Sequence, residues 1–234
     1  MADGLFSRTG IVLGEAGLSR LARSHVAVVG VGGVGSWCAE ALVRTGLGRI
    51  TIVDGDTVAA SNVNRQAMAT AATIGEVKVE AMRRHLIAIN PALAITAIHA
   101  RFNAETAASF DFGAFDAVVD AIDAVDDKAL LIRTAAARSE LGFVSSMGAA
   151  LRMDPGQVRT GVFSKVAGDG LAKALRRRFR AEPPARDFAC VHSLEPAQVS
   201  EREGRGSLMQ VTAAFGLALA AWTVKFLLAK TPEK

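Results

Sequence analysis

A glycine-rich turn between two short apolar runs constrains the fold of this chain more than any other feature. The first run, residues 26–29, is rich in β-branched side chains and too short for a helix, which is typical of a buried strand. A helical pattern begins near Val34, and a second apolar run, residues 50–53, ends on Asp54. Between the first run and the helix lie glycines at G-x-G-G-x-G spacing: Gly30, Gly32, Gly33 and Gly35.

This arrangement predicts a nucleotide site. Glycines in a tight strand-to-helix turn let the backbone approach a phosphate, and the helix N-terminus turns unpaired N–H groups toward it. Asp54 lies 19 residues beyond Gly35, at the end of the second strand, where a carboxylate can bind a ribose hydroxyl.

Composition fits a mildly basic α/β protein. The chain has 234 residues, half of them hydrophobic, and a formal net charge of +4, which suits a polyanionic partner but is also common in soluble enzymes. Its cysteines, Cys38 and Cys190, form neither a disulfide framework nor a C-x-x-C pair. We therefore expect a cytoplasmic protein without structural zinc. Residues 1–10 carry charges and no apolar core, so they do not resemble a signal peptide.

The expected fold is α/β: a Rossmann-like, doubly wound, mostly parallel sheet with an antiparallel extension and a C-terminal apolar helix. Further strands are expected at 93–100, 115–120 and 143–147, and a hairpin at 154–156 leads to the extension at 157–163. We expect one domain with four parts: an N-terminal arm at 1–24, a nucleotide-binding core at 25–163, a basic helix and mobile loop at 164–206, and the last helix at 207–234.

Two helices are expected between the second and fourth strands. Thr73 and Glu76 resemble a capping box, which predicts a helix that begins after Thr73 and ends at Asn90, before Pro91. Lys78 then lies in its first turn, where a lysine more often faces solvent but could reach an anion beside the helix start. A short linking helix is expected within 102–112.

Polar residues follow the second and fourth strands. After Asp54 come Asp56 and a loop with Asn62 and Arg65, which is a ligand-binding loop or a solvated turn. Asp120 and Asp123 end the fourth strand, at the edge where open α/β sheets bind ligands. These two carboxylates could hold Mg²⁺ beside phosphates, or could simply start the next helix.

A basic amphipathic segment at 171–180 is the densest cluster of cations in the chain. Leu171, Leu175 and Phe179 share its apolar face. The polar face is either merely solvated or binds nucleic-acid phosphates, and its candidate nucleic-acid contacts are Arg176, Arg177 and Arg178.

Cys190 and His192 fall in the expected loop. A lone cysteine is usually a small buried hydrophobe, but a histidine two residues away could activate it for substrate or sulfur chemistry.

The last helix, at 208–228, is of borderline length and hydrophobicity for a membrane span. Its many alanines and glycines equally suit a helix that packs closely on the sheet or on a second subunit. We favour the core helix over membrane association.

The motifs as a set resemble the ThiF–MoeB–HesA superfamily of adenylating enzymes. The matching features run from Arg8 to about residue 163 and include the glycine turn, D-x-D at 54–56, S-N-x-N-R-Q at 61–66, G-x-x-K at 75–78 and D-x-x-D at 120–123. The resemblance implies ATP and Mg²⁺ as cofactors, with a monovalent cation as a further candidate. It also implies roles for four residues: Asp54 on the ribose, Arg65 and Lys78 on the triphosphate, and Asp123 on Mg²⁺.

The resemblance also implies a homodimer, in which Arg8 reaches the nucleotide of the partner subunit. The GGVGSW and DAID runs, and more loosely CVHSLE at 190–195, are similar to the tRNA-modifying branch of the superfamily. That branch uses ATP to activate the carboxylate of a threonylcarbamoyl side chain on a tRNA adenosine beside the anticodon, and the side chain then cyclises.

Two other interpretations remain open. One is an activator of a ubiquitin-like sulfur carrier, with Cys190 as the sulfur-handling residue and a sulfur-transfer protein as a partner; the absence of paired C-x-x-C motifs and the basic helix oppose it. The other is a nicotinamide-dependent oxidoreductase or a nucleotide sensor, which has no use for the implied triphosphate ligands Arg65, Lys78 and Asp123.

Overall fold

The computed structural model describes residues 4–198 and 206–230. Within these residues, seven strands form one sheet in the order β3-β2-β1-β4-β5-β7-β6. All neighbouring pairs are parallel except β6 and β7, which are antiparallel. The strands are β1 (His25–Val29), β2 (Arg49–Val53), β3 (Ala94–Ile98), β4 (Ala117–Asp120), β5 (Gly142–Ser146), β6 (Val158–Val162) and β7 (Ala189–Ser193). The predicted fold class is confirmed.

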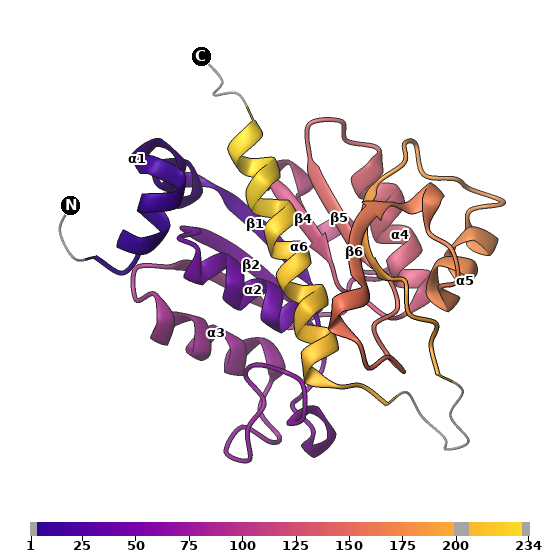
Figure 1. Cartoon of the computed structure of the whole chain (residues 1–234), viewed down its shortest axis with the longest axis horizontal. Helices are drawn as coiled ribbons and strands as arrows, with labels where there is room; N and C mark the ends of the chain where they lie inside the picture. The colour runs from indigo at the N-terminus through magenta and orange to yellow at the C-terminus, as the bar shows by residue number, and fades with distance from the viewer. Residues whose placement is uncertain (1–3, 199–205, 231–234) are drawn as a thin grey trace.

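Helices cover both faces of the sheet (Figure 1). One core lies between the sheet and α2, α3 and α6, and a second lies between the sheet and α4 and α5. Helix α1, in the segment expected as an N-terminal arm, packs beside α6 (Figure 1). The helices are α1 (Ser7–Arg23), α2 (Gly35–Arg44), α3 (Lys78–Ile89), α4 (Val125–Ala136), α5 (Gly170–Arg178) and α6 (Met209–Ala229).

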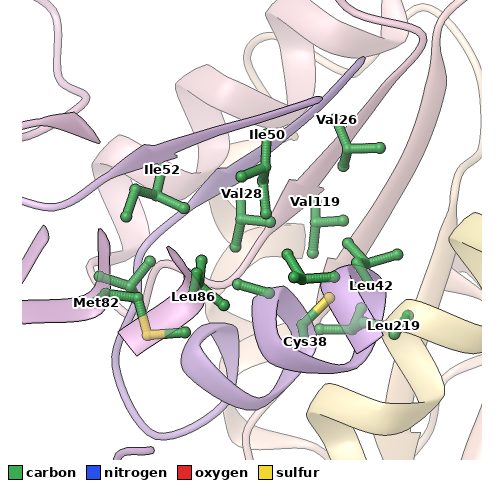
Figure 2. Close-up of a cluster of buried hydrophobic side chains, with 14 of the residues drawn as sticks. Val26, Val28, Cys38, Leu42, Ile50, Ile52, Met82, Leu86, Val119 and Leu219 are labelled. Atoms are coloured by element: carbon green, nitrogen blue, oxygen red, sulfur yellow. The ribbon is translucent and has the colours of Figure 1, made fainter. Parts of the chain in front are cut away.

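Strand β1 contributes side chains to both cores, because successive side chains along it point to opposite faces of the sheet. Val26 and Val28 point toward α2 and belong to the first core (Figure 2), whereas Ala27 and Val29 belong to the second. Because successive side chains of a strand point to opposite faces, a strand buried on both faces is apolar throughout. The continuous run at 26–29 is therefore the sequence signature of this central strand.

Helix α6 packs on α2 as the predicted core helix. A β-carbon on Gly216 would lie 2.5 Å from the carbonyl oxygen of Val34, so only glycine permits this close approach of the two helices. Phe215 and Leu219 are fully buried, whereas Leu217 is exposed. Among the described residues, α6 is the one helix long and apolar enough to cross a membrane, and half of its most apolar stretch is buried in the fold.

The predicted start of α3 is wrong. The helix begins at Lys78, because Gly75 adopts a φ of +90° and a helix that started at Thr73 could not continue through it. The Thr73 hydroxyl instead bonds to the carbonyl oxygens of Met68 and Thr70, closing a local turn. Short polar side chains often bond to nearby backbone in this way rather than cap a helix.

The linking helix expected within 102–112 is also wrong. The segment forms 3₁₀ turns at Ala107–Ser109 and Phe112–Ala114. Phe102 and Phe112 are both buried, with their rings in edge contact. These anchors hold the segment against the second core without a regular helix.

The mobile loop expected at 182–207 contains a sheet strand, β7. Its side chains alternate between the cores, with Cys190 in the second and Val191 in the first. The expected hairpin is wrong as well, since β6 pairs with β7 and β7 lies between β5 and β6. Residues 199–205 of the expected loop lie outside the described residues.

Candidate active site

A cleft of about 780 Å³ opens at the carboxyl ends of β1, β2 and β4. Strand β1 lies between β2 and β4, so the connections that leave β1 and β4 diverge to opposite faces of the sheet (Figure 1). Open α/β sheets bind ligands at such a switch point. The lining includes Gly30, Gly32, Gly33, Asp54, Asp56, Asn62, Arg65, Lys78 and Asp123.

The glycine turn forms the floor of this cleft. Gly30 adopts a φ of +89°, a backbone conformation that residues other than glycine rarely adopt. A β-carbon on Gly35 would lie 1.8 Å from the carbonyl oxygen of Gly30, so the turn can close onto the start of α2 only with glycine there. The Ser36 amide, in the first turn of α2, donates to the Gly32 carbonyl oxygen of the turn at 3.1 Å, and the N-terminus of a helix favours an anion.

Asp54 is fixed beneath the turn by backbone hydrogen bonds. Its Oδ2 accepts from the Val31 amide at 2.9 Å, and its Oδ1 accepts from the Asp56 amide at 3.0 Å. Both carboxylate oxygens are thus held at the end of β2, beside the place where a nucleotide phosphate would meet the glycine turn.

Lys78 is buried at the cleft wall between two carboxylates. Its side-chain nitrogen lies 3.4 Å from Oδ1 of Asp54 and 3.2 Å from Oδ2 of Asp56. Partial burial of Asp56 would raise the pKa of its carboxyl, but Lys78 and Arg101 outweigh this effect and lower the pKa below its usual value. Lys78 therefore faces the cleft at the first position of α3, and not solvent.

The loop with Asn62 and Arg65 forms another wall. Asn62 Oδ1 accepts from the Ala59 amide at 3.0 Å, and the Arg65 carbonyl oxygen accepts from Trp37 Nε1 at 2.8 Å. A β-carbon on Gly33 would lie 3.2 Å from Arg65 Cδ, so the Arg65 side chain lies over the glycine turn. Its guanidinium donates to the Ser61 carbonyl oxygen at 2.8 Å and to Asn64 Oδ1 at 3.0 Å.

Asp120 and Asp123 do not form a pair of metal ligands. Asp120 is fully buried and occupied: Oδ2 lies 2.8 Å from Lys128 Nζ and accepts from Ser145 Oγ at 2.7 Å. Asp123 is exposed at the cleft and makes no hydrogen bond or ion pair with any described residue. The described part of the chain holds no cluster of three or more His, Cys, Asp or Glu residues suited to a metal.

A second end of the cleft was not predicted from the sequence. It is built from the loop after β5 and from the start of α5, and it includes the buried pair Arg152 and Asp169. Arg101, which bonds to Asp56, was also missed. Sequence patterns mark a charged residue in a loop as solvated by default, and only the folded contacts show that Arg152 and Asp169 are buried.

Arg8 and Cys190 do not line the cleft. Arg8 is exposed in the first turn of α1. Cys190 is fully buried in β7, where burial and the charges of Asp187 and Asp169 raise the pKa of its thiol to about 12. The thiol is therefore protonated and shielded, which does not favour a nucleophilic role.

The basic face of α5 is less free than expected. Arg176 donates to the carbonyl oxygen of Phe163 at 3.1 Å and to that of Val166, and its guanidinium lies 5.1 Å from the centre of the Phe163 ring. Arg178 lies 2.6 Å from Asp126 on α4. Of the three candidate arginines, only Arg177 is exposed without a described partner.

Comparison with known proteins agrees with this geometry. The model of the ThiF family matches residues 6–234. The tRNA threonylcarbamoyladenosine dehydratase of Bacillus subtilis is 42% identical over 178 residues, which cover 76% of this chain and 69% of the relative. The molybdopterin-synthase adenylyltransferase of Escherichia coli is 37% identical over 70% of this chain and 63% of its own length.

A solved structure extends the likeness to nearly the whole chain. The tRNA N6-threonylcarbamoyladenosine dehydratase of E. coli in complex with AMP superposes with a TM-score of 0.90 at 34% identity, covering 96% of this chain and 94% of that one. The same enzyme in complex with ATP gives a TM-score of 0.89.

Proposed function

Because the chain belongs to the ThiF family, we propose that it is an ATP-dependent enzyme that dehydrates the threonylcarbamoyl side chain of a tRNA adenosine beside the anticodon. ATP activates the carboxylate of this side chain, and the side chain then cyclises. The support comes from the likeness to enzymes of that name over 76% to 96% of the chain, together with a cleft whose residues suit a nucleoside triphosphate.

One observation carries the proposal most directly. The buried cation Lys78 lies within 3.4 Å of Asp54, the carboxylate at the end of β2, and both line the same cleft as the glycine turn. A ribose-binding carboxylate next to a shielded ammonium suits a nucleotide that carries several phosphates. In a dinucleotide site the glycine turn and the helix N-terminus already bind the pyrophosphate, so such a site does not need an additional buried cation.

The chemistry follows from charge. A carboxylate is a poor electrophile, and transfer of a phosphoryl or adenylyl group to one of its oxygens creates a good leaving group. Lys78 and Arg65 would neutralise the negative charge that builds up on the phosphates during this step. They can do so because both side chains border the cleft at the glycine turn.

Asp123 suits Mg²⁺ binding through a single carboxylate. Its side chain is exposed at the cleft and unpaired among the described residues. Magnesium typically takes one or two carboxylates plus phosphate oxygens and retains several waters. When bound, it would polarise the phosphates and neutralise part of their charge.

We further propose a cytoplasmic homodimer in which Arg8 completes the partner's site. Helix α1 exposes apolar side chains that a single subunit leaves uncovered, namely Ile11 at 67% and Val12 at 81% exposure. Arg8 lies on the same helix and outside its own subunit's cleft. Docking of α1 against a second copy would bury the apolar residues and could carry Arg8 to the other nucleotide.

The second candidate function, activation of a sulfur carrier, has one observation in its favour: 37% identity to a molybdopterin-synthase adenylyltransferase. The buried Cys190 and the absence of paired C-x-x-C motifs weigh against it. Release of pyrophosphate and phosphate from ATP, measured with modified tRNA, unmodified tRNA, a sulfur-carrier protein or no acceptor, separates the two. The proposal requires stimulation by modified tRNA only; stimulation by the carrier alone would replace it with the second function.

A further inference from the structure

Arg101 has no part in the function proposed above, although it lies in the cleft beside the nucleotide residues. Its Nη2 lies 3.4 Å from Oδ1 of Asp56. The other oxygen of this carboxylate, Oδ2, lies 3.2 Å from the buried ammonium of Lys78, which in turn lies 3.4 Å from Oδ1 of Asp54. The carboxylate of Asp56 is therefore shared between an exposed cation and the cation that we assign to the triphosphate.

Close packing on Gly55 brings Arg101 to this position. A β-carbon on Gly55 would lie 2.8 Å from Cγ and 3.0 Å from the backbone nitrogen of Arg101, so the arginine stem lies directly over the glycine. His99, two residues earlier, places its Nε2 within hydrogen-bond distance of the Gly55 carbonyl oxygen, at 3.1 Å. The segment after β3 is thus fixed on the segment that carries Asp56, and the guanidinium of Arg101 meets the Asp56 carboxylate.

The two carboxylates around Lys78 differ in their other partners. Asp54 accepts hydrogen bonds from the amides of Val31 and Asp56 at 2.9 Å and 3.0 Å. It therefore keeps partners when the ammonium of Lys78 turns to a phosphate. Among the described residues, the carboxylate of Asp56 has Lys78 and Arg101 as its only partners. Without Arg101, a phosphate that draws Lys78 away would leave Asp56 as an unpaired negative charge beside further negative charge, which is unfavourable.

We propose that Arg101 is a positioning residue, which holds Asp56 so that the ammonium of Lys78 is free to bind a phosphate of ATP. The inference rests on the ATP binding in the proposed function and adds to it a residue that acts through Asp56 and not through a contact with the nucleotide. Burial raises the pKa of the Asp56 carboxyl less than Lys78 and Arg101 lower it, so this carboxyl is ionised at neutral pH. Its hold on Lys78 is therefore electrostatic, and a second cation at Oδ1 weakens that hold.

Calorimetry of ATP and AMP binding tests this role. Arg101→Gln should weaken ATP binding about threefold to fivefold, which is the scale of an exposed ion pair, and should weaken AMP binding less, because AMP lacks the two outer phosphates. Arg101→Lys should retain most of the ATP affinity, since the contact with Asp56 uses one nitrogen. Arg83→Gln is the matched control, because it removes the same charge from an arginine on α3 that lies outside the cleft and bonds to Glu80.

A double-mutant cycle separates action through Asp56 from direct contact with the nucleotide. In an Asp56→Asn background, Arg101→Gln should weaken ATP binding no more than Arg83→Gln does, because asparagine carries no charge for Arg101 to hold. An equal loss in both backgrounds would overturn the inference, as would a loss in Arg101→Gln that does not exceed the control. Failure of the proposed function is a separate result. Wild-type enzyme that binds ATP without converting modified tRNA refutes the dehydration, while the affinity ratios still decide the role of Arg101.

Discussion

The ammonium nitrogen of Lys128 lies 2.8 Å from Oδ2 of Asp120, and both side chains are fully buried. Lys128 also donates to the Ile122 carbonyl oxygen at 2.9 Å, and Asp120 Oδ1 accepts from the Ile122 amide at 3.0 Å. The ion pair thus binds both the amide and the carbonyl group of Ile122, the residue that precedes Asp123. A buried ion pair at the end of β4 fixes the backbone from which the exposed carboxylate projects into the cleft.

Removal of one partner of this pair should destabilise the protein strongly. Lys128→Met leaves the Asp120 carboxylate buried without its cation, which typically costs about 3–5 kcal/mol. Urea denaturation should show this loss in the free energy of unfolding, and the double variant Asp120→Asn/Lys128→Met should recover much of it. Lys165→Met, at an exposed lysine, is the control; equal stabilities of Lys165→Met and Lys128→Met would contradict the assignment.

ATP binding should depend on Arg65 and Lys78 through charge. Replacement of either with Ala should weaken ATP binding by about 1.5–3 kcal/mol, the usual contribution of a charged hydrogen bond. Isothermal calorimetry at a temperature where each variant is folded measures the effect. Arg83→Ala serves as the control, because Arg83 lies on α3 outside the cleft and bonds to Glu80. Unchanged affinity in both test variants would remove the triphosphate assignment.

A shared active site predicts complementation between two inactive subunits. Arg8→Ala alone and Asp123→Ala alone should each abolish turnover. In a hybrid dimer, one of the two sites combines an intact Asp123 with the partner's intact Arg8, so activity should return in part. Mixed subunits carrying two affinity tags allow purification of the hybrid. Turnover that stays at the level of the inactive parents would show that Arg8 does not act across an interface.

Binding of tRNA to α5 should involve the cations that the fold leaves free. Arg176 anchors α5 to Phe163, so we expect Lys173 and Arg177, which are exposed, to contribute more phosphate contacts. Lys173→Ala/Arg177→Ala should then reduce the log–log salt slope of tRNA binding by about one per lost contact, with ATP affinity unchanged. Filter binding over a range of salt, with Arg83→Ala as control, measures the slope. Coincident slopes would place tRNA elsewhere.

Local patterns predicted the central part of the fold well. The run at 26–29 is apolar throughout because β1 is buried on both faces, and the glycine spacing reports a turn whose geometry excludes a β-carbon at Gly35. Asp54 follows a strand at the edge where ligands bind, so its place beneath the turn could also be anticipated. These features depend on residues that are close together in the sequence, so they can be predicted from a single sequence.

Features that depend on distant partners were missed. Strand β7 follows a stretch that contains Pro184 and Arg186, which is typical of a loop, and it is a strand because β5 and β6 pair with it. Lys128 and Arg152 read as solvated charges, since Asp120 and Asp169 lie 8 and 17 residues away in sequence and meet them only in the folded chain. Helix α3 was predicted to start too early because Gly75 leaves the helical conformation.

The fate of the modified adenosine itself tests the central claim most directly. Purified enzyme would be incubated with ATP, Mg²⁺ and tRNA that carries the threonylcarbamoyl group, and the tRNA digested to nucleosides for mass spectrometry. The account predicts that the modified nucleoside loses the mass of one water, only when ATP is present, and that Lys78→Ala enzyme leaves it largely unconverted. An unchanged nucleoside after incubation with wild-type enzyme that binds ATP would contradict it.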